Sequence, residues 1–228
     1  MNNKSTFMGL RKALATAIVL SSVLGANLTM AVEEPKFETV LKDEAFEIRR
    51  YPPLVVATTQ VPGDMDAASN RGFRTIADYI FGNNVATPAG ASAKIAMTAP
   101  VTLSPVTSAT PAANTVPSDM AAEQWQVQFV MPGQYRLDTL PRPNNAAVTL
   151  RELPARTTAV LSYSWLNSDA KVQQKIDELR AWMKTRQLEA TGSPRLARYD
   201  PPWTLPMWRR NEIQIDIREP SGPATGIQ

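Results

Sequence analysis

The sequence EIRRYP at residues 47–52 has a counterpart in TLRELP at residues 149–154, which begins 102 residues later, at 149 against 47. Each motif is followed by a run rich in β-branched and apolar residues, 54–61 after the first and 156–163 after the second. Runs of this composition and length are typical of β-strands. We interpret the two motifs as the start of two copies of one structural unit.

A helical pattern follows each of these strand runs. Phe73, Ile76 and Ile80 recur at the spacing of one helix face. Asp64 is suited to the N-cap of this helix, and Gly82 to the position just after its C-cap. A second helix is expected from about Asp169 to Leu188. Its apolar face lies 103 residues after that of the first helix and consists of Ile176, Leu179 and Met183.

The remaining strand patterns complete two similar halves. Further strands are expected at 37–41, 45–51, 94–98, 101–104, 124–131 and 211–217. Pro202 and Thr204 match Pro100 and Thr102 at the same offset of 102. Residues 104–121 are rich in Ser, Thr, Ala and Pro and are expected to form a loop.

This duplication defines the expected fold. Two helices cover one shared sheet better than two separate sheets. We therefore predict an α+β fold: a distorted antiparallel β-barrel with two helices, duplicated about a pseudo-twofold axis, with repeats at about 36–131 and 132–218. Such a frame leaves a groove near the helices, which is a usual place for a small ligand.

The two ends of the chain are expected to lie outside this domain, which covers 32–220. Lys4, Arg11 and Lys12 precede the apolar run 13–24, and small residues follow up to Ala31. This pattern predicts a signal peptide at 1–31, with an uncleaved amphipathic anchor as the alternative. We expect a periplasmic or secreted protein with no membrane span after cleavage, and a disordered tail at 221–228.

Composition excludes several classes of chemistry. The 24 Lys and Arg residues exceed the 21 Asp and Glu residues only because the first 31 residues carry three basic residues and no acidic one. The mature chain is therefore formally neutral, which gives no reason to expect a nucleic-acid partner. The chain has no Cys and no His. Disulfides, thiolate metal sites and histidine ligation of metal or haem are therefore excluded.

Several stretches resemble the SOUL/haem-binding protein family over roughly residues 36–218. The similar stretches are FEIRRYPP (46–53), KIAMTAPV (94–101), FVMP (129–132), ARYDPPWT (197–204) and RRNE (209–212). The resemblance implies the same duplicated barrel. It also implies that haem or another tetrapyrrole binds non-covalently in a hydrophobic groove, as in some members.

The resemblance places this groove beside the first helix. The candidate binding residues are Asn70, Phe73, Arg74, Ala77, Met97 and Tyr199. Asn70 and Asp78 stand where some members have cationic residues, and an aspartate there would repel haem propionates. Without histidine, an iron ligand would have to come from methionine or tyrosine, and binding without any axial ligand is also conceivable. The candidate ligands are Met97, Met131, Tyr79 and Tyr199.

Other interpretations of the same residues stay open. Met97 and Phe73 have the residue types and spacing of ordinary core positions. Arg209 to Glu212 could be a strand start whose charges are solvated or paired with acids such as Asp200. The protein could instead bind a different apolar small molecule or a protein partner. It could also be a hydrolase or haem-modifying enzyme that uses Glu47, Glu152 or Glu212, although no geometry favours catalysis over binding.

Overall fold

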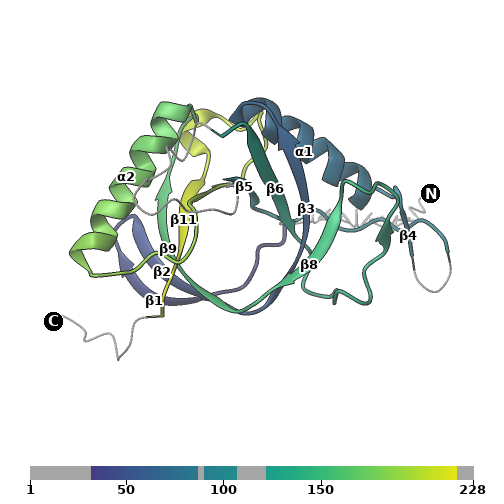
Figure 1. The fold of residues 1–228 in the computed structure, drawn as a ribbon, viewed down its shortest axis with the longest axis horizontal. Coiled ribbons are helices and arrows are strands. Elements are labelled where there is room, and N and C mark those ends of the chain that lie inside the picture. The colour runs from purple at the N-terminus through teal and green to yellow at the C-terminus, as the bar shows by residue number, and fades with distance from the viewer. Residues whose placement is uncertain (1–31, 87–89, 107–121, 220–228) are drawn as a thin grey trace, which may run out of the picture. The chain divides into compact units, whose positions relative to one another are not determined.

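The computed structural model describes residues 32–86, 90–106 and 122–219. In these residues the chain is α+β, as predicted (Figure 1). One nine-stranded sheet, in which all pairings are antiparallel, packs against two helices, and a separate two-stranded sheet lies near the end of the first helix. The predicted signal peptide at 1–31, the tail from 220 and most of the predicted loop, 107–121, lie outside the described residues.

The elements have the following bounds. The large sheet contains β1 (Glu38–Asp43), β2 (Phe46–Tyr51), β3 (Leu54–Pro62), β5 (Val101–Pro105), β6 (Gln124–Val130), β8 (Thr149–Leu153), β9 (Arg156–Tyr163), β10 (Arg195–Arg198) and β11 (Asn211–Ile217). The small sheet pairs β4 (Asn84–Val85) with β7 (Arg142–Pro143). The helices are α1 (Met65–Ile80), α2 (Asp169–Thr185) and the short 3₁₀ helix η1 (Pro206–Trp208).

The strand order shows the duplication directly. It runs β1-β2-β9-β11-β10-β5-β6-β3-β8. Four strands of the first half have an equivalent in the second half: β2 corresponds to β8, β3 to β9, β5 to β10 and β6 to β11. With β1 left out, each strand and its equivalent lie at the same distance from opposite ends of this order. The first strand of each half pairs with the second strand of the other half, β2 with β9 and β8 with β3. The two halves meet where β5 pairs with β10, so the fold is pseudo-twofold.

The predicted barrel is a strongly curled open sheet. Its edges are β1 and β8, and no pairing joins them in the described part of the chain. Figure 1 shows the sheet bending round, with α1 against β3 and β6 and α2 against β9 and β11. Among the described residues, no helix has both the length and the apolar character needed to cross a membrane.

The first helix begins and ends where the sequence predicts. The Asp64 side chain accepts a hydrogen bond from the Ala67 N–H at 2.7 Å, and Gly82 follows the helix with a φ of +126°. Ile76 and Ile80 are buried, but Phe73 is 37% exposed and lies at the edge of the buried face. Gly72 lets the helix approach the sheet, because a Cβ atom there would lie 2.3 Å from Val127 Cγ2.

Three sequence predictions of secondary structure are wrong. Residues 94–98 form no strand, because the N–H of Ile95 binds the carbonyl of Ile80 at the end of α1 instead of a strand partner. The match of Pro202 and Thr204 to Pro100 and Thr102 concerns the offset alone; the two residues lie in a turn, and the counterpart of β5 is the short strand β10. The second helix ends at Thr185 rather than near Leu188. Two residues of the predicted loop, 104 and 105, belong to β5.

Candidate functional site

Four of the six predicted binding residues share one side of α1. Asn70, Phe73, Arg74 and Ala77 are spaced by three, four and seven residues, which aligns them along one side of a helix. Asn70 and Arg74 are exposed, whereas Ala77 is buried. The Phe73 ring packs against Phe129 with centroids 5.5 Å apart and remains partly exposed. This stripe therefore presents an aromatic face and a cation to solvent.

Met97 and Tyr199 are placed differently from these four. Met97 is half-buried and packs against the hydrophobic core. Its segment is anchored on one side by the bond between Ile95 and Ile80, and on the other by the Thr98 hydroxyl, which donates to the Val130 carbonyl. Tyr199 does not belong to the α1 stripe, because its hydroxyl is bound inside a polar cluster on the sheet.

This polar cluster has the buried pair Arg49 and Glu212 at its centre. Glu212 is 1% exposed. The Arg49 guanidinium donates to both Glu212 oxygens, from Nη1 at 3.0 and 3.1 Å and from Nη2 at 3.1 Å. The Tyr199 hydroxyl donates to Glu212 Oε2 at 2.7 Å, and Gln214 Nε2 donates to the same oxygen at 2.9 Å. Arg49 Nε donates to Glu47 at 2.6 Å. The residues come from β2, β11 and the segment after β10.

The pKa shifts in this cluster follow from burial and charge pairing. Burial alone would lower the pKa of Arg49, but the negative charge of Glu212 raises it above its usual value. Burial, and then the adjacent Glu212 charge, raise the pKa of Tyr199, so its hydroxyl keeps its proton and acts as a donor. Burial would raise the pKa of Glu47, but the hydrogen bond from Arg49 lowers it overall.

This arrangement ties the two halves of the fold together. Glu212 already accepts hydrogen bonds from four residues, the fourth being Ser162 at 3.5 Å. If it took up a proton as a general base, the buried Arg49 charge would lose its compensation. Sequence reasoning missed its pairing with Arg49, although both residues lie in stretches that carry the family resemblance. Asp200 meets Arg210 through the Arg210 backbone N–H, at 2.6 Å, and not through the charge pairing considered from the sequence. The Arg210 side chain pairs with Glu34 and stacks over the Tyr199 ring.

A second charged cluster lies on the same face of the sheet. Arg195 donates to both oxygens of Asp216 at 2.6 and 2.7 Å, and the Thr158 hydroxyl donates to the same carboxylate at 2.8 Å. Arg156 lies 3.6 Å from Asp216. Burial lowers the pKa of Arg156, and the positive charge of Arg195 lowers it further.

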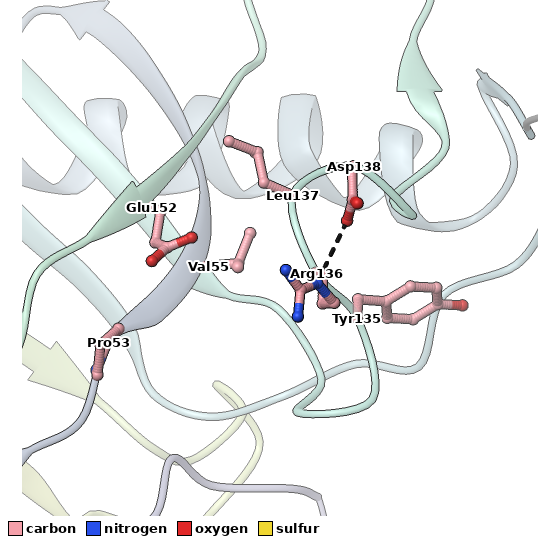
Figure 2. Close-up of a pocket in the computed structure, with 7 residues that line it drawn as sticks. All are labelled: Pro53, Val55, Tyr135, Arg136, Leu137, Asp138 and Glu152. Carbon is pink, nitrogen blue, oxygen red and sulfur yellow. Dashed lines mark ion pairs between the residues drawn. The ribbon is translucent and has the colours of Figure 1, made fainter.

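Two cavities open on the surface of the described part of the chain. Figure 2 shows the larger one, of about 590 Å³, between the start of β3, β8 and the loop after β6. It is lined by Pro53, Val55, Tyr135, Arg136, Leu137, Asp138 and Glu152. The smaller cavity, of about 280 Å³, lies beside Arg156 and Asp216. Neither cavity is lined by any of the six predicted binding residues, so the groove expected beside the first helix is not one of these two.

Fold and site together define a duplicated α+β domain with a tightly paired polar interior. A family model described as SOUL heme-binding protein matches residues 32–216. The chain therefore belongs to the SOUL heme-binding protein family, as its sequence motifs indicate. A search of curated proteins gave no match.

Solved structures with similar folds share little sequence with this chain. The C-terminal domain of EcmrR has a TM-score of 0.52 and 12% identity, over 76% of this chain and 96% of that chain. EcmrR in a complex with DNA has a TM-score of 0.54 and 13% identity, over 77% of this chain and 59% of that chain. A hydrolase from Listeria innocua has a TM-score of 0.45 and 14% identity, over 82% and 93% of the two chains. At these identities the likeness concerns the fold alone.

Proposed function

We propose that this protein binds haem or a related tetrapyrrole, non-covalently and without a histidine ligand, on the α1 stripe around Phe73. Membership of a family described as haem-binding carries the proposal. The chemistry of the stripe supports it, because an exposed aromatic ring can pack against a flat macrocycle. The exposed Arg74 guanidinium, one residue further along, can pair with a propionate.

The mode of binding follows from which side chains are accessible. The Tyr79 hydroxyl donates to the Pro141 carbonyl at 2.9 Å, and the Tyr199 hydroxyl is held by Glu212. Met131 is 4% exposed. Of the four candidate iron ligands, Tyr79 and Tyr199 are engaged through their hydroxyls and Met131 is deeply buried, so only the half-buried Met97 is left. We therefore propose that apolar contact, rather than strong axial ligation, provides most of the affinity.

The test is a titration of the purified protein with hemin, followed by the Soret band, and a parallel titration with iron-free protoporphyrin. Because binding does not depend on ligation, we expect both to saturate with similar affinities. Phe73→Ala and Arg74→Gln should each weaken binding. Asp78→Asn should strengthen it, since it removes a negative charge one turn from Arg74.

The control is Leu137→Ala, an exposed apolar residue on the loop after β6 and not a member of the α1 stripe, which should leave the titration unchanged. Absence of a saturable Soret shift in the parent protein would sink the proposal. Equal affinities for the parent, Phe73→Ala and Arg74→Gln would show that tetrapyrrole binds elsewhere.

Export is part of the same proposal. The expected signal peptide at 1–31 would place tetrapyrrole binding in the periplasm or outside the cell. Mass spectrometry of the protein from an exporting host should give a mature chain that begins at Val32. An N-terminus at Met1 in the exported fraction would contradict cleavage and favour the uncleaved anchor.

A further inference from the structure

Six large apolar side chains are exposed on two loops of the fold. One loop, 164–168, connects β9 to α2, and the other, 199–210, connects β10 to β11. We call the six the tryptophan patch; its members are Trp165, Leu166, Trp203, Leu205, Met207 and Trp208. Each is between 49% and 82% exposed. Three of the five tryptophans of the chain are therefore in the patch. Such a concentration of exposed apolar residues marks an interaction surface.

The two loops are held together as one structure. The Trp165 N–H donates to the Pro206 carbonyl at 2.9 Å, and the Asn211 side chain donates to the Trp165 carbonyl at 2.9 Å. At the start of the second loop, Arg198 pairs with Asp66 in the first turn of α1. In Figure 1 this loop is the yellow segment between the ends of α1 and α2.

Several backbone groups of the second loop are hydrogen-bonded within the loop. The N–H groups of Thr204, Trp208 and Arg209 bind carbonyls within the loop at 2.9 to 3.2 Å. The Arg209 guanidinium binds the carbonyls of Thr204 and Pro202. The prolines of the loop have no N–H to satisfy. Internal pairing of this kind lowers the cost of entering a lipid environment, because hydrocarbon offers no partner for a free backbone group.

Trp165 is displayed at a conformational cost. Its φ of +94° is one that bulky L-residues rarely adopt. The hydrogen bonds at its N–H, to Pro206, and at its carbonyl, from the Asn211 side chain, hold the backbone of Trp165 in this conformation. Its side chain remains 54% exposed. Strain of this kind is concentrated at functional positions, and nothing in the packing of the core requires a tryptophan here.

We propose that the tryptophan patch inserts into the interfacial region of a phospholipid bilayer and attaches the protein peripherally to a membrane surface. Tryptophan is the side chain that prefers this region, since its ring is apolar and its indole N–H is polar. The two loops, 164–168 and 199–210, contain one acidic residue, Asp200, and two basic residues, Arg209 and Arg210. The formal charge of the loops is therefore positive, which favours anionic headgroups. The patch also sits on projecting loops rather than in a groove, which suits a lipid surface better than a small ligand.

The test is co-sedimentation with vesicles of phosphatidylethanolamine and phosphatidylglycerol, read together with the tryptophan emission spectrum. The protein is taken from an exporting host, and the parent and variants are compared with the same N-terminus, so that residues 13–24 contribute equally if present. Trp203→Ser with Trp208→Ser removes the two most exposed members of the patch. The matched control is Leu137→Ser, an exposed apolar residue on another loop.

We expect the parent to sediment with vesicles and to show a blue shift of its emission. The double variant should partition at least about tenfold more weakly, and the control should behave as the parent does. A parent that stays in the supernatant overturns the proposal, as does a double variant that binds equally well. Two further results also overturn it: self-association of the parent that the double variant abolishes, and a loss of hemin affinity in the double variant. A failure of hemin binding in the parent alone leaves this proposal untouched.

Discussion

Replacing Glu212 by glutamine should destabilise the protein strongly, because it removes the charge that compensates a buried guanidinium. Arg49 would keep only Glu47, at 2.6 Å, as a carboxylate partner. The new amide would also present a donor to a site where Tyr199, Gln214 and Arg49 all donate. Breaking a buried pair of this kind costs about 3–5 kcal/mol. Since Glu47 remains, we expect a loss near the lower end, about 3 kcal/mol.

The measurement is urea unfolding followed by circular dichroism, with the slope m compared between variants to check that the unfolded state is unchanged. A loss of about 3 kcal/mol corresponds to a fall of about 6–12 °C in Tm for a domain of this size. The double variant Arg49→Met with Glu212→Leu should lose less than the sum of the two single changes, because it leaves no unpaired central charge.

The matched control is Glu38→Gln, since Glu38 pairs with Arg50 at 2.9 Å on the exposed surface. An exposed pair of this kind contributes little, so this variant should unfold as the parent does. If Glu212→Gln and Glu38→Gln proved equally harmless, the central role given to the Arg49 and Glu212 pair would be refuted.

Three further changes test other parts of the structure. Burial would raise the pKa of Asp216, but the hydrogen bonds from Arg195 hold it below the usual 3.8. The contribution of the ionised Asp216 to stability is therefore present above pH 3.8 and lost as the pH falls through the folded-state pKa. The difference in free energy of unfolding between the parent and Asp216→Asn should therefore narrow as the pH is lowered. A difference that stayed constant with pH would contradict this assignment. Trp165→Gly should be more stable than Trp165→Ala by about 1 kcal/mol in thermal unfolding, because only glycine adopts a positive φ without strain; the reverse order would contradict the strain. Gly72→Ala should lower stability by about 1–3 kcal/mol, although alanine has the better helix propensity. Adding Val127→Ala to the same chain should restore part of this loss, because it removes the side chain that the new Cβ meets. If the two losses simply added, the close approach of α1 to Val127 would be contradicted.

Local patterns in the sequence predicted most of the elements. The expected strand at 156–163 matches β9, because its run of β-branched and apolar residues is typical of strands. The expected strand at 211–217 matches β11, because Ile213, Ile215 and Ile217 alternate along it. The helix caps at Asp64 and Gly82 are equally local. The strand β10 was missed because its four residues, from Arg195 to Arg198, carry charges at both ends and are too few to show an alternating pattern, although the turn residues 192–194 precede it.

Pairing between distant segments could not be predicted in the same way. Arg49 and Glu212 are separated by 163 residues, and they meet only because β2 and β11 both pair with β9. The sequence indicates two similar halves, but not that the first strand of each half would pair within the other. Which strands pair depends on how the two halves bury their apolar faces together, and this cannot be deduced from the pattern of a short stretch of sequence.

The polar cluster also narrows where a ligand can bind. Tyr199 has the residue type of a groove wall, yet its hydroxyl is committed to Glu212, and Glu212 is committed to Arg49. With these side chains occupied by each other, two surfaces with accessible aromatic rings are available for the proposed interactions: the α1 stripe around Phe73 and the tryptophan patch. The two proposals are separable, because they use different side chains. Phe73→Ala should weaken hemin binding and leave vesicle binding intact, while the double change at Trp203 and Trp208 should do the reverse. A double variant that lost hemin binding as well would overturn the assignment of the tryptophan patch to a membrane surface.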